Sequence, residues 1–143
     1  MRTISFMGVC VLVASGVDFD VDEYLKDSPF KPQHIYRKGE ILAENNPARE
    51  ALTESGFVVL VGEDEYPELV GQVLGALDYW EEELHQLNDA GAEKLVLDFG
   101  ITEEAMLQRP QYLPSELILA MSRLEMGLVF SVVRPADDLG PRR

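Results

Sequence analysis

Apolar residues in this chain form continuous runs in some segments and helical repeats in others. The apolar-rich runs at residues 6–14, 57–61 and 95–99 predict β-strands, and the run at residues 57–61 is apolar throughout, as in a buried strand. In residues 67–89 apolar side chains instead recur three or four positions apart, which predicts one amphipathic helix. Pro67 suits the first turn of this helix, and Gly91 suits the left-handed backbone conformation that commonly ends a helix.

Shorter elements fill the interval between the first two runs. Asp20 is placed to cap a short helix at residues 21–26, where acidic side chains lie at the positive end of the helix dipole. Residues 35–37 predict a second strand. Gly39 follows this strand and suits a turn or bulge that needs unusual backbone angles.

The C-terminal third of the chain predicts one more helix and one more strand. The helix is expected to begin at Pro114 and Ser115. Its apolar face is expected to comprise Leu117, Ile118, Met121 and Leu124. Gly127 then precedes the apolar run at residues 128–133, which predicts the last strand.

The order of these elements indicates the fold class. Strand, helix, strand, strand, helix and strand are followed by a further helix and strand, and the first six match a split βαβ, ferredoxin-like arrangement. We therefore expect one α+β domain at residues 1–135, with the helices on one face of the sheet. Residues 136–143 are expected to form a flexible tail.

Composition excludes several classes of function. The chain has 143 residues, of which 46% are hydrophobic, so it has enough apolar surface for a core. It carries 26 acidic and 12 basic side chains, a formal net charge of −14. This acid excess argues against binding of nucleic acid or of an anionic membrane, both of which depend on Lys and Arg.

The cysteine content points to a reducing compartment. Cys10 is the single cysteine, so the chain has no internal disulfide and no multi-cysteine metal site. Cys10 lies within the first apolar run, where it is expected to be a small buried hydrophobic residue rather than a reactive thiol. The same run has some features of a signal peptide, but its valines and Gly8 favour a buried strand. We expect a cytoplasmic protein.

Three short motifs stand out along the chain. They are the turn Tyr36-Arg37-Lys38-Gly39-Glu40, which fits an aromatic-x-Lys-Gly-Glu pattern, and the segments at residues 113–117 and 126–128. These motifs resemble those of a small bacterial family of domains of unknown function. The resemblance spans roughly residues 6–133. It supports the fold and implies no catalytic residues. In size and charge the chain is also similar to immunity proteins that accompany bacterial toxins, which implies an inhibitory protein-binding role.

Acidic residues gather around the long predicted helix and are the candidate partner-binding site. This set comprises Glu63, Asp64, Glu65, Glu68, Glu81, Glu82 and Glu83. A charge run is commonly a solvated face, and the alternative interpretation is a surface that attracts a basic protein. We expect a non-enzymatic acidic binding domain, most specifically an immunity-type inhibitor of a basic toxin or enzyme.

No catalytic, cofactor-binding or metal-binding residues are expected. Asp18, Asp20 and Asp22 imitate the start of a calcium loop, but the positions that require glycine and a bidentate glutamate hold Glu23 and Pro29. The two histidines, His34 and His85, are far apart in the sequence, and nothing in it brings them together. Helix capping and solvation are the simpler interpretation of the aspartates.

Two alternative functions remain open at this point. Gly71 and Gly75 are one turn apart in the long predicted helix, where they cost stability unless something packs closely against them. They would let the helix approach either the sheet or a second subunit, and the second possibility motivates a structural or regulatory homodimer. A small-molecule binder is the remaining alternative, for which the sequence shows no phosphate-binding loop.

Overall fold

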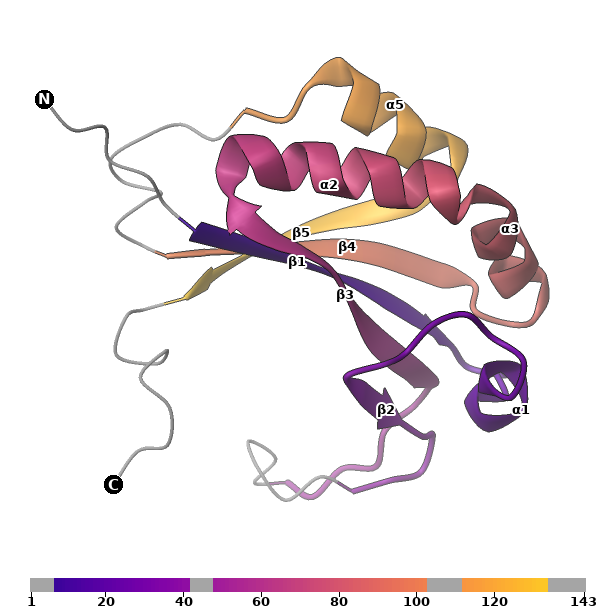
Figure 1. Cartoon of the computed structure of the whole chain (residues 1–143). Coiled ribbons are helices and arrows are strands. Elements are labelled where there is room, and N and C mark those ends of the chain that lie inside the picture. Colours follow the sequence, from indigo (N-terminus) through magenta and orange to yellow (C-terminus); the bar gives the residue numbers. More distant parts are fainter. Residues whose placement is uncertain (1–6, 42–47, 103–111, 134–143) are drawn as a thin grey trace, which may run out of the picture.

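A computed structural model describes residues 7–41, 48–102 and 112–133 and shows a five-stranded sheet with helices packed on it (Figure 1). The predicted tail, residues 136–143, lies outside the described residues. The elements are β1 (Met7–Gly16), α1 (Val21–Leu25), β2 (His34–Tyr36), β3 (Ser55–Glu65), α2 (Tyr66–Tyr79), α3 (Glu81–Asp89), β4 (Lys94–Thr102), α5 (Ser115–Arg123) and β5 (Met126–Val133). This order of elements is the predicted one, except that two helices, α2 and α3, occupy the place of the single helix expected at residues 67–89.

The sheet has the strand order β2-β3-β1-β4-β5. β1 lies at its centre and pairs antiparallel with β3 and with β4, and β2 pairs antiparallel with β3. β4 and β5 form a parallel pair that is connected through the segment containing α5. The mixture of a largely antiparallel sheet with separate helices confirms the α+β class. None of the described helices is long and apolar enough to cross a membrane.

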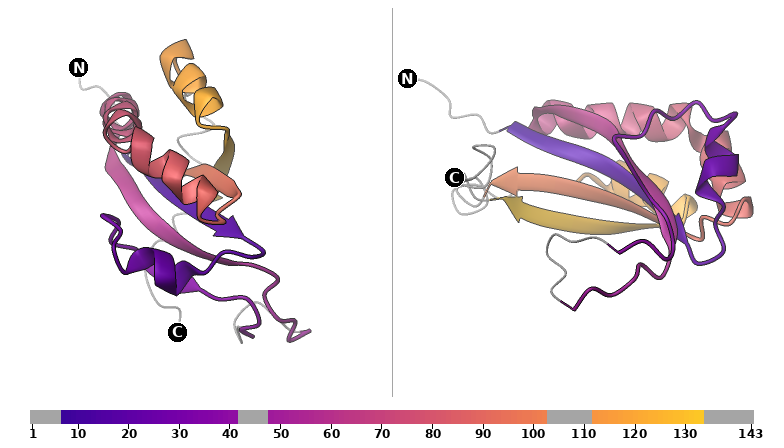
Figure 2. Two further views of the ribbon diagram at one scale, coloured as in Figure 1. Left: turned by 90° about the vertical axis from the view of Figure 1, so that its right-hand side faces the viewer. Right: turned by 90° about the horizontal axis from the view of Figure 1, so that it is seen from below.

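Alternation along the strands places one set of side chains under the helices. Cys10, Leu12 and Ala14 of β1 are fully or almost fully buried, whereas the valines between them are only partly buried on the opposite face of the sheet. β4 alternates in the same way. Helices α2, α3 and α5 lie over the buried face (Figures 1 and 2). Cys10 is fully buried and is therefore a core residue as expected, and this burial raises the pKa of its thiol to about 12.

Aromatic side chains fill the core at the end of the sheet where β2 and α1 lie. Phe57 of β3 is fully buried, and its ring lies 5.7–6.2 Å from those of Phe19, Tyr24 and Phe30. Phe30 in turn meets Trp80 edge to face at 4.9 Å. These contacts attach α1 and the following loop to the sheet, because each comes from a different segment of the chain.

Three details of the helices and strands differ from the prediction. The helix expected at residues 67–89 is divided at Trp80, whose backbone angles leave the helical range where its ring packs on Phe30. β3 continues to Glu65, so the first acidic residues lie within a strand. Ile118 is 46% exposed, so it does not belong to the buried face of α5, which is formed by Leu117 and Met121.

Two glycines confirm the backbone conformations predicted for them. Gly91 has φ +113° directly after α3, and Gly39 has φ +95° in the turn after β2. L-residues rarely adopt such angles, so glycine is the residue that these turns favour. Asp20 also has its predicted role, because its carboxylate accepts a hydrogen bond from the Glu23 backbone N–H at 3.2 Å and caps α1.

Gly71 and Gly75 do not bring α2 closer to the sheet, which was the first interpretation of them. A Cβ atom added at either position meets no described atom within 4 Å. Both glycines lie on the solvent side of α2, opposite Leu69 and Val73.

Replacing Gly71 or Gly75 by alanine is therefore expected to stabilise the protein by about 0.8–1 kcal/mol each, because alanine loses less backbone entropy in a helix. Urea unfolding followed by circular dichroism measures the change. Ala76→Gly in the same helix is the reverse control and should destabilise by a similar amount. A loss of stability in Gly71→Ala or Gly75→Ala would contradict the exposed placement.

Candidate functional site

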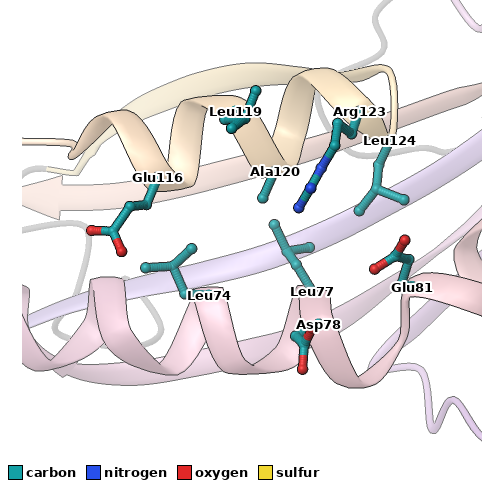
Figure 3. A pocket seen from close by; sticks show the side chains of 9 residues that line it. All are labelled: Leu74, Leu77, Asp78, Glu81, Glu116, Leu119, Ala120, Arg123 and Leu124. Atoms are coloured by element: carbon teal, nitrogen blue, oxygen red, sulfur yellow. The ribbon is translucent and has the colours of Figure 1, made fainter.

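A groove of about 300 Å³ runs between α2 and α5 on the outside of the helix layer (Figure 3). The two helices lie side by side in Figure 1, and they are also in contact. The groove is lined by Leu74, Leu77, Asp78, Glu81, Glu116, Leu119, Ala120, Arg123 and Leu124.

The floor of the groove is apolar because each helix has a second apolar flank beside its buried face. On α5, Leu117 and Met121 point into the core, Ala120 faces α2, and Leu119 lines the groove from the outer side of the helix (Figure 3). Leu119 is 59% exposed, which leaves a large apolar side chain open to solvent. The small side chain of Ala120 leaves space opposite Leu77 (Figure 3). The groove thus offers apolar surface that a binding partner would cover.

Charged side chains surround this floor. Glu116 lies near one end, and Asp78 and Glu81 lie toward the other, where Arg123 reaches from α5 toward α2 (Figure 3). Within the described part of the chain, no carboxylate oxygen lies within 4.0 Å of a guanidinium nitrogen of Arg123. Three carboxylates against one guanidinium leave the rim negative.

A second, smaller hollow of about 240 Å³ adjoins the groove at the end of α5. It is lined by Leu84, His85, Asn88, Asp89, Arg123, Leu124 and Glu125. Arg123 and Leu124 belong to both hollows, so the concave surface continues from α2 along α3. Asp89 and Glu125 add further negative charge there.

The predicted acidic residues form two groups rather than one surface. Glu63, Asp64 and Glu65 end β3, and Glu68 lies in the first turn of α2. The remaining three, Glu81, Glu82 and Glu83, begin α3 beyond the other end of α2. Since α2 has 14 residues and a helix rises about 1.5 Å per residue, about 21 Å separates the two ends. Of the seven residues, Glu81 lines the groove.

Two of these carboxylates make hydrogen bonds that hold the fold together. Asp64 accepts from the Gln72 side chain at 2.8 Å and from the Glu65 backbone N–H at 2.7 Å, which ties β3 to α2. Glu83 accepts a hydrogen bond from the Tyr24 hydroxyl, which ties α3 to α1. Burial first, and then the hydrogen bond to Glu83, raises the pKa of Tyr24. These two carboxylates are therefore less available to a partner than the exposed members of the set.

The other polar motifs are engaged in local structure. Arg37 donates to both oxygens of Asp22 at 2.8 Å, and its backbone N–H donates to Glu40 at 2.9 Å. The hydrogen bond from Arg37 lowers the pKa of the Asp22 carboxyl. Arg37 is thus engaged by carboxylates of its own neighbourhood. Among the described residues, no three histidine, cysteine or acidic side chains gather in a way that could hold a metal ion.

The histidines and the serine of the last strand are not brought together. His34 stacks on Tyr36 in β2, and His85 lies on α3 beside the smaller hollow. Ser131 donates its hydroxyl hydrogen to Asp98 at 2.7 Å between β5 and β4. This pair has no histidine beside it among the described residues, so the arrangement differs from that of a catalytic triad.

Most residues of the groove were not candidates from the sequence. Asp78, Glu116 and Arg123 are single charged residues outside any charge run, and Leu119 lies within the apolar segment of a predicted helix. One signal was present. Leu119 is apolar but lies two positions from Leu117, outside the helical repeat of the buried face, and such a residue indicates a second apolar flank.

Comparison of the chain with protein-family models, with curated proteins and with solved structures finds no match in any of the three.

Proposed function

We propose that this chain is a non-enzymatic, acidic protein-binding domain, and more specifically an immunity-type inhibitor that covers a basic surface of a toxin or enzyme. The observation that carries the proposal is the groove between α2 and α5, with an apolar floor and three carboxylates on its rim. An apolar cleft with a negative rim is complementary to an apolar anchor that is flanked by Lys or Arg.

Binding would proceed in two physical steps. The net charge of −14 attracts a basic partner over a distance and raises its rate of association, an effect that salt screens. An apolar or aromatic side chain of the partner then enters the groove and covers Leu119, which supplies the short-range part of the affinity. The rim residues Glu81 and Glu116 select a partner whose charges flank that anchor.

The two acidic groups have different roles in this mechanism. Glu81 lines the groove at the start of α3, so it can contact the partner directly. Glu63 and Glu65 are exposed at the opposite end of α2 and contribute mainly to the long-range field. This difference makes the two groups a matched pair for an experiment.

The experiment compares two double charge reversals with equal net charge. Glu81→Lys with Glu116→Lys changes the rim, and Glu63→Lys with Glu65→Lys changes the far end. The tagged protein is used to recover a basic partner from the lysate of its own cell at low and moderate salt, and stopped-flow then measures association with that partner. We expect the rim pair to slow association about tenfold and to abolish stable recovery. The far pair should slow association about twofold.

If the two charge reversals slowed association equally, only the long-range field of the net charge would matter, and the groove would not be the binding site. A third variant, Leu119→Asp, tests the apolar step separately. It keeps the rim carboxylates and should raise the dissociation rate while association stays fast. Recovery that is unaffected by salt and by all three variants would overturn the proposal as a whole.

We further propose a cytoplasmic location and a ferredoxin-like variant for the fold. The order β2-β3-β1-β4, with antiparallel neighbours throughout, supports a split βαβ pattern. α5 and β5 extend it by one parallel strand. The fold departs from that pattern at α1, which has five residues and packs at the end of the sheet beside Phe57.

A further inference from the structure

The outer edge of β5 is apolar and unpaired within the described part of the chain. β5 is the last strand of the sheet and has eight residues without a single charge or proline. Its side chains at Leu128, Val129, Phe130 and Val132 are 36–51% exposed. The opposite edge differs, because β2 has only three residues.

An edge of this kind is open to pairing with another strand. Its unpaired backbone groups offer hydrogen bonds, and proteins commonly protect such edges with charges, proline or short strands. β2 is protected by its shortness and β5 has none of these protections. The difference between the two edges indicates that a specific binding partner covers the edge of β5.

The outer flank of α5 continues this apolar strip above the sheet. Leu117 and Met121 face the core, and Glu116 and Arg123 line the groove toward α2. Helical periodicity therefore places Ile118, which is 46% exposed, on the side of α5 that faces away from α2. Since α5 packs on β5, Ile118 and the exposed residues of β5 belong to neighbouring elements at this edge of the sheet.

We propose that β5 pairs antiparallel with β5 of a second copy of this chain across a two-fold axis, so that the sheets of the two copies become continuous. The absence of charge on β5 supports this occupant, because it offers no counter-charge to a basic partner and sets no like charges opposite one another in two copies that each carry a net charge of −14. Ile118 on α5 is likewise uncharged. The groove lies on the other flank of α5 and stays open in such a dimer.

The available area predicts a reversible dimer. Eight strand residues span about 26 Å, and the sheet edge with one helix above it is about 20 Å deep, which gives about 500 Å² per copy. The total of about 1,000 Å² is at the lower limit of specific interfaces. The dimer is therefore expected to dissociate on dilution.

Sedimentation velocity from about 1 to about 100 μM protein, at about 0.05 and 0.5 M NaCl, tests the proposal. The fraction of dimer should rise with concentration, and also with salt, because salt screens the repulsion between two acidic copies. Val129→Glu brings two carboxylates together near the axis and should weaken the dimer at least tenfold. Val17→Glu is the matched control, because Val17 is 45% exposed and lies outside β5; this variant should dimerise like the unmodified protein.

Hydrogen–deuterium exchange gives a second measurement that needs no variant. Amides of β5 should become better protected as the concentration rises, while those of α2 should not change. A monomer at every concentration and salt would overturn the proposal, as would a dimer that Val129→Glu leaves intact. A monomer in which Val129→Glu instead abolishes capture of another protein would assign the edge to a partner's strand and would also overturn it.

The outcome is independent of the proposed inhibitory function. Salt should strengthen the dimer but weaken binding of a basic partner, so the two associations respond in opposite directions. The rim variant with Glu81→Lys and Glu116→Lys should still dimerise, and Val129→Glu should still bind the basic partner. The experiments can therefore contradict the dimer without contradicting the inhibitory function, and the reverse.

Discussion

Replacing Phe57 by alanine is expected to lower the free energy of unfolding by about 3–5 kcal/mol. The Phe57 ring is fully buried and contacts three other aromatic rings, from Phe19, Tyr24 and Phe30. These three residues precede β3 by more than twenty positions, so their contacts with Phe57 are tertiary contacts between distant segments of the chain. Truncation would leave a cavity that these segments cannot fill without moving.

Urea unfolding measures this loss, and Leu60→Ala is its control in the same strand. Leu60 is 39% exposed and lies on the opposite face of the sheet, so its truncation should cost about 1 kcal/mol or less. Near-ultraviolet circular dichroism should also change in Phe57→Ala, because Tyr24 stacks on Phe57 and Phe30 contacts both Phe57 and Trp80. Equal losses of unfolding free energy in Phe57→Ala and Leu60→Ala would show that the aromatic cluster does not stabilise the end of the sheet near β2 and α1.

The strands were predictable because their apolar runs are a local property of the sequence. Each run gave the correct element, but the end of β3 did not follow from it. Glu63 and Glu65 pair with Val9 and Met7 of β1 and so continue the strand. Backbone hydrogen bonds hold them there, and hydrophobic patterning does not detect a strand segment that is held by its partner.

The helix break had no local signal either. The apolar repeat runs through Trp80 without interruption, and it predicts one helix. The division arises because the Trp80 ring packs on Phe30, a residue fifty positions earlier in the chain. Tertiary contacts of this kind override helix propensity.

The candidate site illustrates the same limit for function. Runs such as residues 81–83 are conspicuous along the chain, and they drew attention to charge. Of that run only Glu81 lines the groove, together with Asp78 on the same side and Glu116 on the other, and these residues converge only when α2 and α5 pack together. A prediction from the sequence would have required the pairing of two helices that are about 40 residues apart.

Replacing Gly16 by alanine is expected to lower the free energy of unfolding by about 3 kcal/mol. A Cβ atom at this position would lie 2.0 Å from the carbonyl oxygen of Gly91, which is backbone and cannot rotate away. The Gly91 turn is itself constrained, because its N–H donates to Asn88 and its carbonyl accepts from Glu93. Relief of the clash would therefore displace either the end of β1 or the whole turn between α3 and β4.

The matched comparison is Gly71→Ala, the same chemical change with the opposite expected sign. Nothing lies within 4 Å of a Cβ atom at Gly71, so only the gain in helix propensity remains there. Urea unfolding of both variants should give shifts in opposite directions that differ by about 4 kcal/mol. A loss of less than about 1 kcal/mol in Gly16→Ala would mean that the end of β1 and the Gly91 turn can move apart at little cost. The close backbone contact would then not be what positions α3 against the sheet.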